Sequence, residues 1–494
     1  MGRLFATKPI KTILAEAEGS GEQHTLKRAL GPVNLITLGI GAIIGAGIFV
    51  LTGTASAQFA GPAIVISFVI AGIGCIFAGL CYAEFASMIP IAGSAYTYGY
   101  ATMGELVAWI IGWALVLEYA FGAATVAVGW SGFVNSLVSF FGAKLPFNPA
   151  PSLTIPLFGH TLKAQVDLFA LAAIVVITIV LVVGVRESAN FNSGAVMIKV
   201  SVVLIFVGLA TAFAFGHWPH MTANWHPFIP KNTGEFGHYG WSGIMRGAGV
   251  VFFAYIGFDA VSTAAQEARN PQKDMPFGIL GSLIICTALY IIVSALLTGV
   301  MPYTALNVPA PVADAAAVIG VRWAVILIDL GAIAGLASVM LVMLLGQSRV
   351  LYTMSHDGLF WPWSSKLHPR FRTPYITSIV VGTFAAFLAA FFPIGFLGEL
   401  VSLGTLLAFT IVSLGVWVMR VKQPDLNRPF RTPLVPLVPI CGVIVSLALM
   451  FSLDAAAWIG FVCWLIFGQI IYFTYSRKHS KVQRLEQTGA RKGN

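Results

Sequence analysis

The amino-acid sequence predicts an all-α membrane protein with twelve transmembrane helices. Of its 494 residues, 58% are apolar and only 10% are charged, and the mean hydropathy is +0.87. A soluble domain carries about 25% charged residues, so these charges are too few to cover several globular domains. A span needs about 20 apolar residues, and a chain of this length therefore has room for about a dozen.

Apolar runs bounded by charged residues, proline or glycine divide the chain into these twelve spans. Proline marks several of the boundaries, with Pro302 after the seventh run, Pro374 before the ninth and Pro393 after it. The expected spans are 33–60, 63–88, 104–134, 165–185, 191–215, 241–266, 275–300, 321–353, 374–392, 397–420, 434–453 and 456–476.

Lysine and arginine orient the chain, because basic residues concentrate in the cytoplasmic loops of membrane proteins. With the N-terminus inside, most of the 28 basic residues fall in inner segments and Lys199 falls within a span. The outer segments hold only Lys144, Lys163, Lys231, Arg246 and Arg322. We therefore expect a multi-pass protein of the plasma membrane with both termini in the cytoplasm.

Composition and motif spacing exclude several other classes. The net charge of +9 is explained by the inner loops and does not call for a nucleic-acid partner. The outer histidines and the five cysteines match no zinc pattern, so we expect no metal and no cofactor. No nucleophile–base pair, phosphate loop or metalloprotease motif is present, which predicts that the protein is not an enzyme.

Glycine-rich segments interrupt the first and the sixth span. Residues 39–49 contain four glycines, and residues 247–259 combine glycines with an acid, Asp259. Glycine destabilises a helix interior by about 1 kcal/mol, although small residues also allow close packing of helices. The two segments occupy corresponding positions of two five-span halves, a pattern that indicates a transporter site at the membrane centre.

Three motifs carry a resemblance to a known family. They are Gly41-Ala-Ile-Ile-Gly-Ala-Gly-Ile-Phe49, the segment Cys81–Tyr98 after the second span, and Phe252–Thr263 followed by Glu267-Ala-Arg-Asn-Pro271. Together they resemble the amino acid–polyamine–organocation (APC) superfamily, and the third is similar to its cationic amino acid transporter branch. The resemblance implies a LeuT-like fold of 5 + 5 inverted repeats plus two C-terminal helices, which works by alternating access.

This fold divides the chain into five parts. They are a cytoplasmic N-terminal segment (1–30), a first inverted repeat of spans 1–5 (31–215), a second repeat of spans 6–10 (241–420), spans 11 and 12 (434–476) and a cytoplasmic tail (477–494).

The two interruptions predict a receptor for a zwitterion. A half-helix that begins near Ala46 points unpaired N–H groups and a partial positive charge at the membrane centre, where a carboxylate is the natural ligand. The outer half of span 6 ends near Phe253 with free carbonyls that suit an ammonium group. Ile44, Gly45, Ala46 and Gly47 form the first interruption. An α-amino acid has the matching shape.

The resemblance also implies which residues contact the substrate. Phe253, Ala254 and Ile256 would supply the carbonyl groups. Ile43, Phe253 and Met343 would line the side-chain pocket, and these apolar residues favour a small or medium neutral amino acid.

Lys199 is the most informative charge, because no ionisable residue lies within seven positions of it. A charge at this depth is a functional hypothesis by default, although a lysine can also extend to the membrane surface. In the family, a span-5 lysine occupies the place of the cation of sodium-driven relatives. This residue therefore predicts proton coupling, with the Ser338 hydroxyl as a partner.

Two acids, Glu118 and Asp259, also lie deep in spans. The resemblance places them on the cytoplasmic side of the site together with Tyr290. They form either a polar network that latches spans or relays protons, or hydrogen bonds that only pack helices.

We therefore expect a proton-coupled symporter that carries small or medium neutral L-amino acids and has amino acid, protons and the lipid bilayer as partners. Cationic amino acid uptake, amino acid exchange by the same fold, and a nutrient sensor that does not transport remain alternatives. The sequence leaves open whether the chain forms oligomers or binds a small single-span subunit.

Overall fold

The computed structural model describes residues 2–8, 30–89, 94–143, 151–157, 160–184, 189–265, 268–371 and 373–484. In these residues, seven helices are long and apolar enough to cross a membrane, and four shorter apolar helices accompany them. Together with the broken helix of span 6 they account for all twelve expected spans. The second half of the first span and the whole of the second form one continuous apolar helical stretch, Gly47–Met88.

The helical bounds follow the expected spans closely. Span 1 is divided into α2 (Pro32–Ile43) and a second half of η2 (Gly47–Leu51), α3 (Thr52–Ala55) and η3 (Ser56–Ala60), and span 6 into α10 (Gly240–Val251), η5 (Phe252–Tyr255) and α11 (Phe258–Thr263). The others are α4 (Ile64–Met88), α6 (Glu105–Phe140), α7 (Leu168–Val183), α8 (Ala189–Gly216), α12 (Pro271–Val300), α14 (Arg322–His356), α15 (Tyr375–Phe391), α16 (Ile394–Lys422), α17 (Leu437–Phe451) and α18 (Ala455–Ile471).

The helices pair in the way that two related halves of five helices would produce. Helix α2 packs on α12, and its counterpart α10 packs on α4. Likewise α8 packs on α14, and α16 packs on α6. Three further contacts join helices that hold the same position in each half: α4 with α12, α6 with α14, and α7 with α15. The last two spans lie outside this arrangement, with α17 against α16 and α4, and α18 against α16 and α6.

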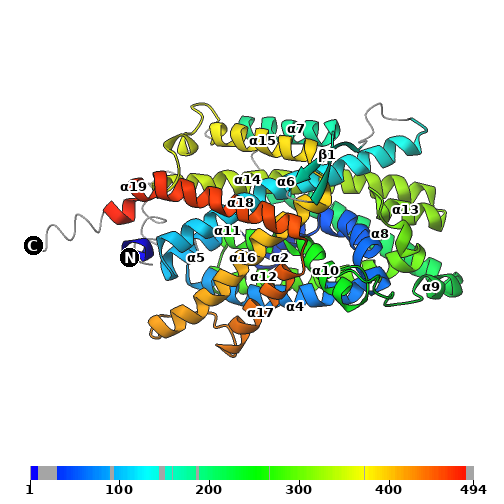
Figure 1. The fold of residues 1–494 in the computed structure, drawn as a ribbon, viewed down its shortest axis with the longest axis horizontal. Helices are drawn as coiled ribbons and strands as arrows, with labels where there is room; N and C mark the ends of the chain where they lie inside the picture. Colours follow the sequence, from blue (N-terminus) through cyan, green and yellow to red (C-terminus); the bar gives the residue numbers. More distant parts are fainter. Residues whose placement is uncertain are drawn as a thin grey trace, which may run out of the picture.

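Figure 1 shows α7 and α15 side by side along one edge of the bundle and α17 at the opposite edge. The N-terminal residues and the C-terminal helix α19 (Arg477–His479) lie at the same end, as an even number of spans requires. We call this the terminal end of the bundle.

Short elements close the opposite end. They include α9 (Trp218–Asn224), α13 (Pro311–Ile319) and an antiparallel pair of strands, β1 (Pro151–Leu157) and β2 (His160–Gln165). The register joins Leu157 to His160 and Leu153 to Ala164. This hairpin adds two strands to an otherwise helical chain, and it lies in the loop between the third and fourth spans.

Glycines allow the central helices to approach closely, because a side chain there would meet the neighbouring helix. A Cβ atom on Gly346 of α14 would lie 3.2 Å from the ring of Tyr119 on α6, and one on Gly122 of α6 would lie 3.5 Å from Met343 Sδ. The pair α6 and α14 thus forms an antiparallel core on which the two broken helices are assembled.

Candidate functional site

The first span is broken where the sequence predicts it. Helix α2 ends at Ile43, the next residue turns to an extended backbone with ψ of 103°, and helical geometry resumes at Ala46. The residues between the halves are Ile44 and Gly45, and both are buried. A helix start lacks partners for its first N–H groups, so the second half presents these donors at the break.

The sixth span is broken at the level of the first. The helix narrows to a 3-10 turn at Phe252–Tyr255, Ile256 is extended with ψ of 136°, and Gly257 has φ of 112°. A Cβ atom on Gly257 would lie 2.7 Å from the carbonyl oxygen of Ala42. Both the left-handed backbone and this close approach therefore require glycine.

The two breaks are packed against each other. A Cβ atom on Gly47 would overlap Ala254, which shows that the backbones touch at this point. The hydroxyl of Tyr290, on α12, lies 3.0 Å from the carbonyl oxygens of both Ile43 and Ala254. Tyr290 thus joins the end of α2 to the break in span 6, and it lies at the breaks themselves.

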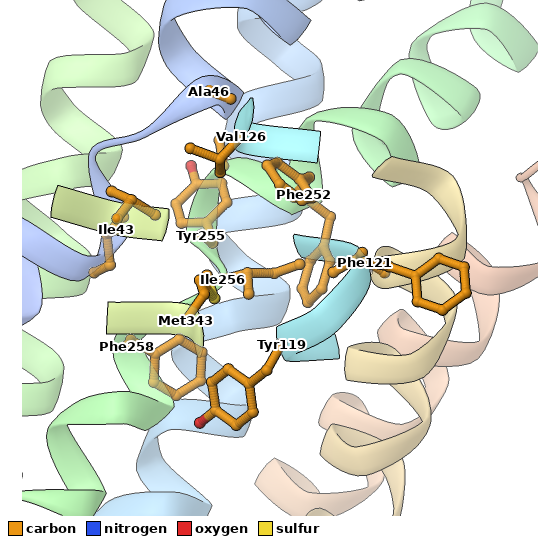
Figure 2. Close-up of a cluster of buried hydrophobic side chains, with 14 of the residues drawn as sticks. Ile43, Ala46, Tyr119, Phe121, Val126, Phe252, Tyr255, Ile256, Phe258 and Met343 are labelled. Carbon is orange, nitrogen blue, oxygen red and sulfur yellow. The ribbon is translucent and has the colours of Figure 1, made fainter. Parts of the chain in front are cut away.

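A small, nearly closed cavity of about 10 Å³ lies at this crossing. Figure 2 shows several of the apolar side chains around it, among them Ile43, Ile256 and Met343. Four helical spans supply its walls. Its lining residues are Ala42, Ile43, Gly45, Ala46, Gly47, Val126, Phe253, Ile256, Val339 and Met343. Every lining side chain is apolar or absent, so polar groups reach a ligand here only from the broken backbones.

Most of the residues predicted to contact substrate line this cavity, namely Ile43, Gly45, Ala46, Gly47, Phe253, Ile256 and Met343. Ile44 and Ala254 belong to the breaks but are not among the lining residues. The carbonyl of Ala254 accepts from Tyr290, and that of Phe253 accepts from the N–H of Ile256 at 3.2 Å. Sequence reasoning did not single out Val126 and Val339, because helices that are apolar all round give no sign of which face turns inward.

Lys199 reaches the end of α2 from α8. Its Nζ donates a hydrogen bond of 2.7 Å to the carbonyl oxygen of Gly41, and the residue is 1% exposed. In an unbroken helix this carbonyl would accept from residue 45, but the chain leaves the helix at Ile44. The ammonium group therefore caps a carbonyl that the break leaves without a partner, at the negative end of the half-helix.

Ser338 does not take the place expected for it. Its hydroxyl donates to the carbonyl of Gly335 within α14 at 2.9 Å. The Lys199 stem packs against that same glycine, where a Cβ atom would lie 2.8 Å from the Lys199 Cγ atom. The absence of a side chain at this glycine thus leaves room for the Lys199 side chain. The ammonium group bonds to the backbone carbonyl of Gly41 and not to the Ser338 hydroxyl.

The buried acids Glu118 and Asp259 lie together, on the side of the cavity nearer the terminal end. Their carboxyl groups are close enough to interact electrostatically. The hydroxyl of Tyr119 donates to Asp259 Oδ2 at 3.3 Å, and Figure 2 shows Tyr119 beyond Met343, on the side away from Ala46. The two acids thus lie close together, Glu118 on α6 and Asp259 on α11. Tyr290 does not join them but contacts the two breaks.

Ion pairs tie the helices at both ends of the bundle. At the terminal end, Lys8 Nζ lies 2.9 Å from Asp357, which also accepts from the Tyr96 hydroxyl at 2.8 Å. At the other end, Arg246 lies 3.6 Å from Glu399 and stacks over the ring of Phe59 at 4.4 Å. These pairs join segments up to 349 residues apart in the chain, so spacing along the sequence gave no sign of them.

A third cluster lies at the terminal end of the bundle, where α4 and α16 end. Arg420 binds Glu84 through Nε at 2.9 Å and Nη2 at 2.8 Å, and the Thr432 N–H donates to the same carboxylate at 2.7 Å. The loop that follows α16 is thereby anchored to α4.

The sequence matches the family model described as amino acid permease over residues 30–480. It is 45% identical over 489 residues to the branched-chain amino acid permease BcaP of Bacillus subtilis (strain 168), covering 98% of this chain and 100% of the relative. It is 43% identical to the methylthioribose transporter of the same organism, with the same coverage of both chains. It is also 29% identical to the human cationic amino acid transporter 4, covering 96% of this chain and 91% of the relative.

Proposed function

The chain belongs to the amino acid permease family of the APC superfamily, and we propose that it is a proton-coupled symporter of small or medium neutral L-amino acids. One observation carries this proposal. Two broken helices cross at a cavity in which unpaired N–H groups, carbonyl groups and apolar side chains converge. An apolar α-amino acid offers a carboxylate to the N–H groups, an ammonium to the carbonyl groups and an apolar side chain to the apolar residues.

The lining of the cavity supports a neutral side chain. None of the ten lining residues is charged, whereas a guanidinium or a second ammonium would need an acidic partner. Val126, Val339 and Met343 form an apolar wall, whose chemistry suits a branched aliphatic side chain once the site opens. The relative at 45% identity is named for branched-chain amino acids, which agrees with this preference. Cationic substrates are the weaker alternative.

The position of Lys199 supports proton coupling. Its ammonium is the group that holds the Gly41 carbonyl, at the end of the broken helix. Loss of its proton would remove two of the features that stabilise this arrangement, the positive charge and the charge-assisted hydrogen bond. A proton at Lys199 would thereby bias the position of α2, and binding of substrate at the adjoining break would depend on it.

Orientation and symmetry complete the proposal. The concentration of basic residues supports cytoplasmic termini and insertion in the plasma membrane. The paired helix contacts support two inverted repeats, 31–215 and 241–420, followed by spans 11 and 12 at 434–476. Alternating access then consists of movement of the broken helices against the α6–α14 core.

The test is uptake into proteoliposomes. We expect radiolabelled leucine or valine to accumulate when the outside is acidic, with counterflow of the same amino acid in the absence of a gradient. Arginine should compete poorly. Counterflow without gradient-driven accumulation would indicate an exchanger, and absence of both would contradict transport of amino acids and leave a sensor.

The relative at 43% identity is named for methylthioribose, which is a different substrate class. Its thioether would suit the apolar lining near Met343, but it carries neither a carboxylate nor an ammonium for the two breaks. We expect it to compete with leucine less than valine does. Tighter competition by methylthioribose than by any amino acid would reverse the assignment.

A further inference from the structure

Three buried polar groups on the cytoplasmic side of the cavity have atoms without a hydrogen-bond partner among the described residues. They are Glu118 Oε1 on α6, both amide atoms of Gln347 on α14, and the hydroxyl of Tyr82 on α4. Gln347 is 0% exposed and Glu118 is 1% exposed. A buried polar group without a partner is costly, so such groups in a native fold call for an explanation.

The packing of α6 on α14 places Glu118 and Gln347 at the same level. Gly122 faces Met343, and Tyr119 faces Gly346, which fixes the antiparallel register of the two helices. Residues four apart lie on one face of a helix, so Glu118 follows Gly122 and Gln347 follows Met343 one turn further toward the terminal end. The carboxyl and the amide therefore lie on facing surfaces, yet they do not bond to each other.

Met343 separates these two groups from the cavity. Its side chain lines the cavity and its sulfur meets the face of α6 at Gly122. A substrate that leaves the cavity along the α6–α14 seam toward the terminal end has to displace Met343. The next polar groups that it meets are Glu118 and Gln347. Met343 is flexible and unbranched, which suits a side chain that swings aside.

From this arrangement we propose that Glu118 and Gln347 form a release station for the amino acid, one helical turn beyond the cavity. The inference rests on the proposed function and adds a second site to it. The Glu118 carboxyl oxygen and the Gln347 amide oxygen accept from the substrate's ammonium group, and the amide nitrogen donates to its carboxylate. Because these atoms are unpartnered in this structure, the station binds substrate without breaking existing hydrogen bonds.

The chemistry of the station agrees with a transient site. Glutamine offers a donor and an acceptor on one side chain, which matches the two charged groups of a zwitterion. The apolar side chain of the substrate finds no equivalent of the cavity here, since the neighbours of Glu118 include the polar Tyr82 and Asp259. The station therefore binds less tightly than the cavity, as a step on the way out requires.

The test compares Gln347→Met, which keeps length and removes polarity, with Gln469→Met as a matched control. Gln469 lies in an open apolar groove on α18, away from the seam between α6 and α14. In proteoliposomes, we expect Q347M to bind leucine with a Kd within about threefold of wild type, while its counterflow rate falls about tenfold or more. Gln347→Asn, which retains an amide, should restore part of the rate. Q469M should match wild type in both.

Three results would overturn the inference. A wild-type counterflow rate in Q347M would show that the station is dispensable. An equal loss of leucine binding and rate would place Gln347 in support of the cavity. A lower melting temperature with an unchanged rate per folded molecule would indicate that Gln347 only binds a structural water. If the wild-type protein neither binds nor exchanges any amino acid, the proposed function fails and the station fails with it. If the wild-type protein does both and Q347M keeps the wild-type rate, only the station fails.

Discussion

Substitution of Gly47 by alanine tests the crossing of the two breaks. The added Cβ atom would overlap Ala254, lying 2.4 Å from its Cβ and 2.8 Å from its backbone nitrogen. These atoms belong to the opposite break, and backbone cannot turn aside as the end of a flexible side chain can. The two half-helices must therefore separate in G47A, which moves the N–H groups of span 1 away from the carbonyl groups of span 6.

The expected size of the effect follows from overpacking of a buried contact, which costs about 1–3 kcal/mol. At about 1.4 kcal/mol for each factor of ten, this cost corresponds to a loss of about 5-fold to 150-fold in the population of the native crossing. We expect leucine affinity to fall by a factor within this range. Titration of leucine against purified protein, followed by thermal shift or radioligand binding, gives the measurement.

Gly45→Ala is the matched control, two residues away in the same break. Its Cβ atom would lie 3.5 Å from the Val339 side chain, an ordinary van der Waals distance, and no backbone lies closer than 4.0 Å. We expect G45A to melt within the error of wild type and to lose less affinity than G47A. Equal melting temperatures and equal leucine affinities in the two variants would refute the account of the crossing.

Three further substitutions probe the coupling group, the bridge between the breaks and the pocket wall. Lys199→Met keeps most of the side-chain bulk but cannot carry a proton, so leucine uptake should lose its response to a pH gradient, while counterflow persists at a lower leucine affinity. Uptake that still follows the gradient would exclude Lys199 as the coupling group. Tyr290→Phe leaves the carbonyl groups of Ile43 and Ala254 without their hydroxyl donor, which costs about 1–3 kcal/mol. The counterflow rate should fall about tenfold, and an unchanged rate would show that water replaces the hydroxyl. Val339→Ala enlarges the cavity, so competition by phenylalanine should improve relative to valine, and an unchanged ranking would place the substrate side chain elsewhere.

The sequence predicted the elements of the site that depend on local chemistry. Both breaks were predictable because glycine is unfavourable within a helix and two glycine-rich segments occupy equivalent spans. Lys199 was predictable as a functional candidate because a charge deep in an apolar run is costly. Its partner was not, because the free carbonyl of Gly41 arises only after the chain leaves the helix at Ile44.

The elements that escaped prediction depend on helix rotation and on contacts across the chain. Val126 and Val339 lie on spans whose faces are all apolar, so periodicity gives no inward direction. Gln347 is uncharged and carries no motif, and it becomes informative only because its amide is buried without a partner. The pair of Lys8 with Asp357 joins the N-terminal segment to the end of α14, which no local pattern encodes.

The end of α2 shows how one proton can control substrate binding. Two of its last carbonyl groups are capped from other helices, Gly41 by Lys199 of α8 and Ile43 by Tyr290 of α12. In the proposed repeats these helices belong to different halves, so α2 moves only when both bonds break or both partners follow. Tyr290 also holds Ala254 and thus couples α2 to span 6. Loss of the proton from Lys199 weakens the first of these two hydrogen bonds. The bond from Tyr290 then remains to hold the end of α2, and it acts at the crossing where the amino acid binds.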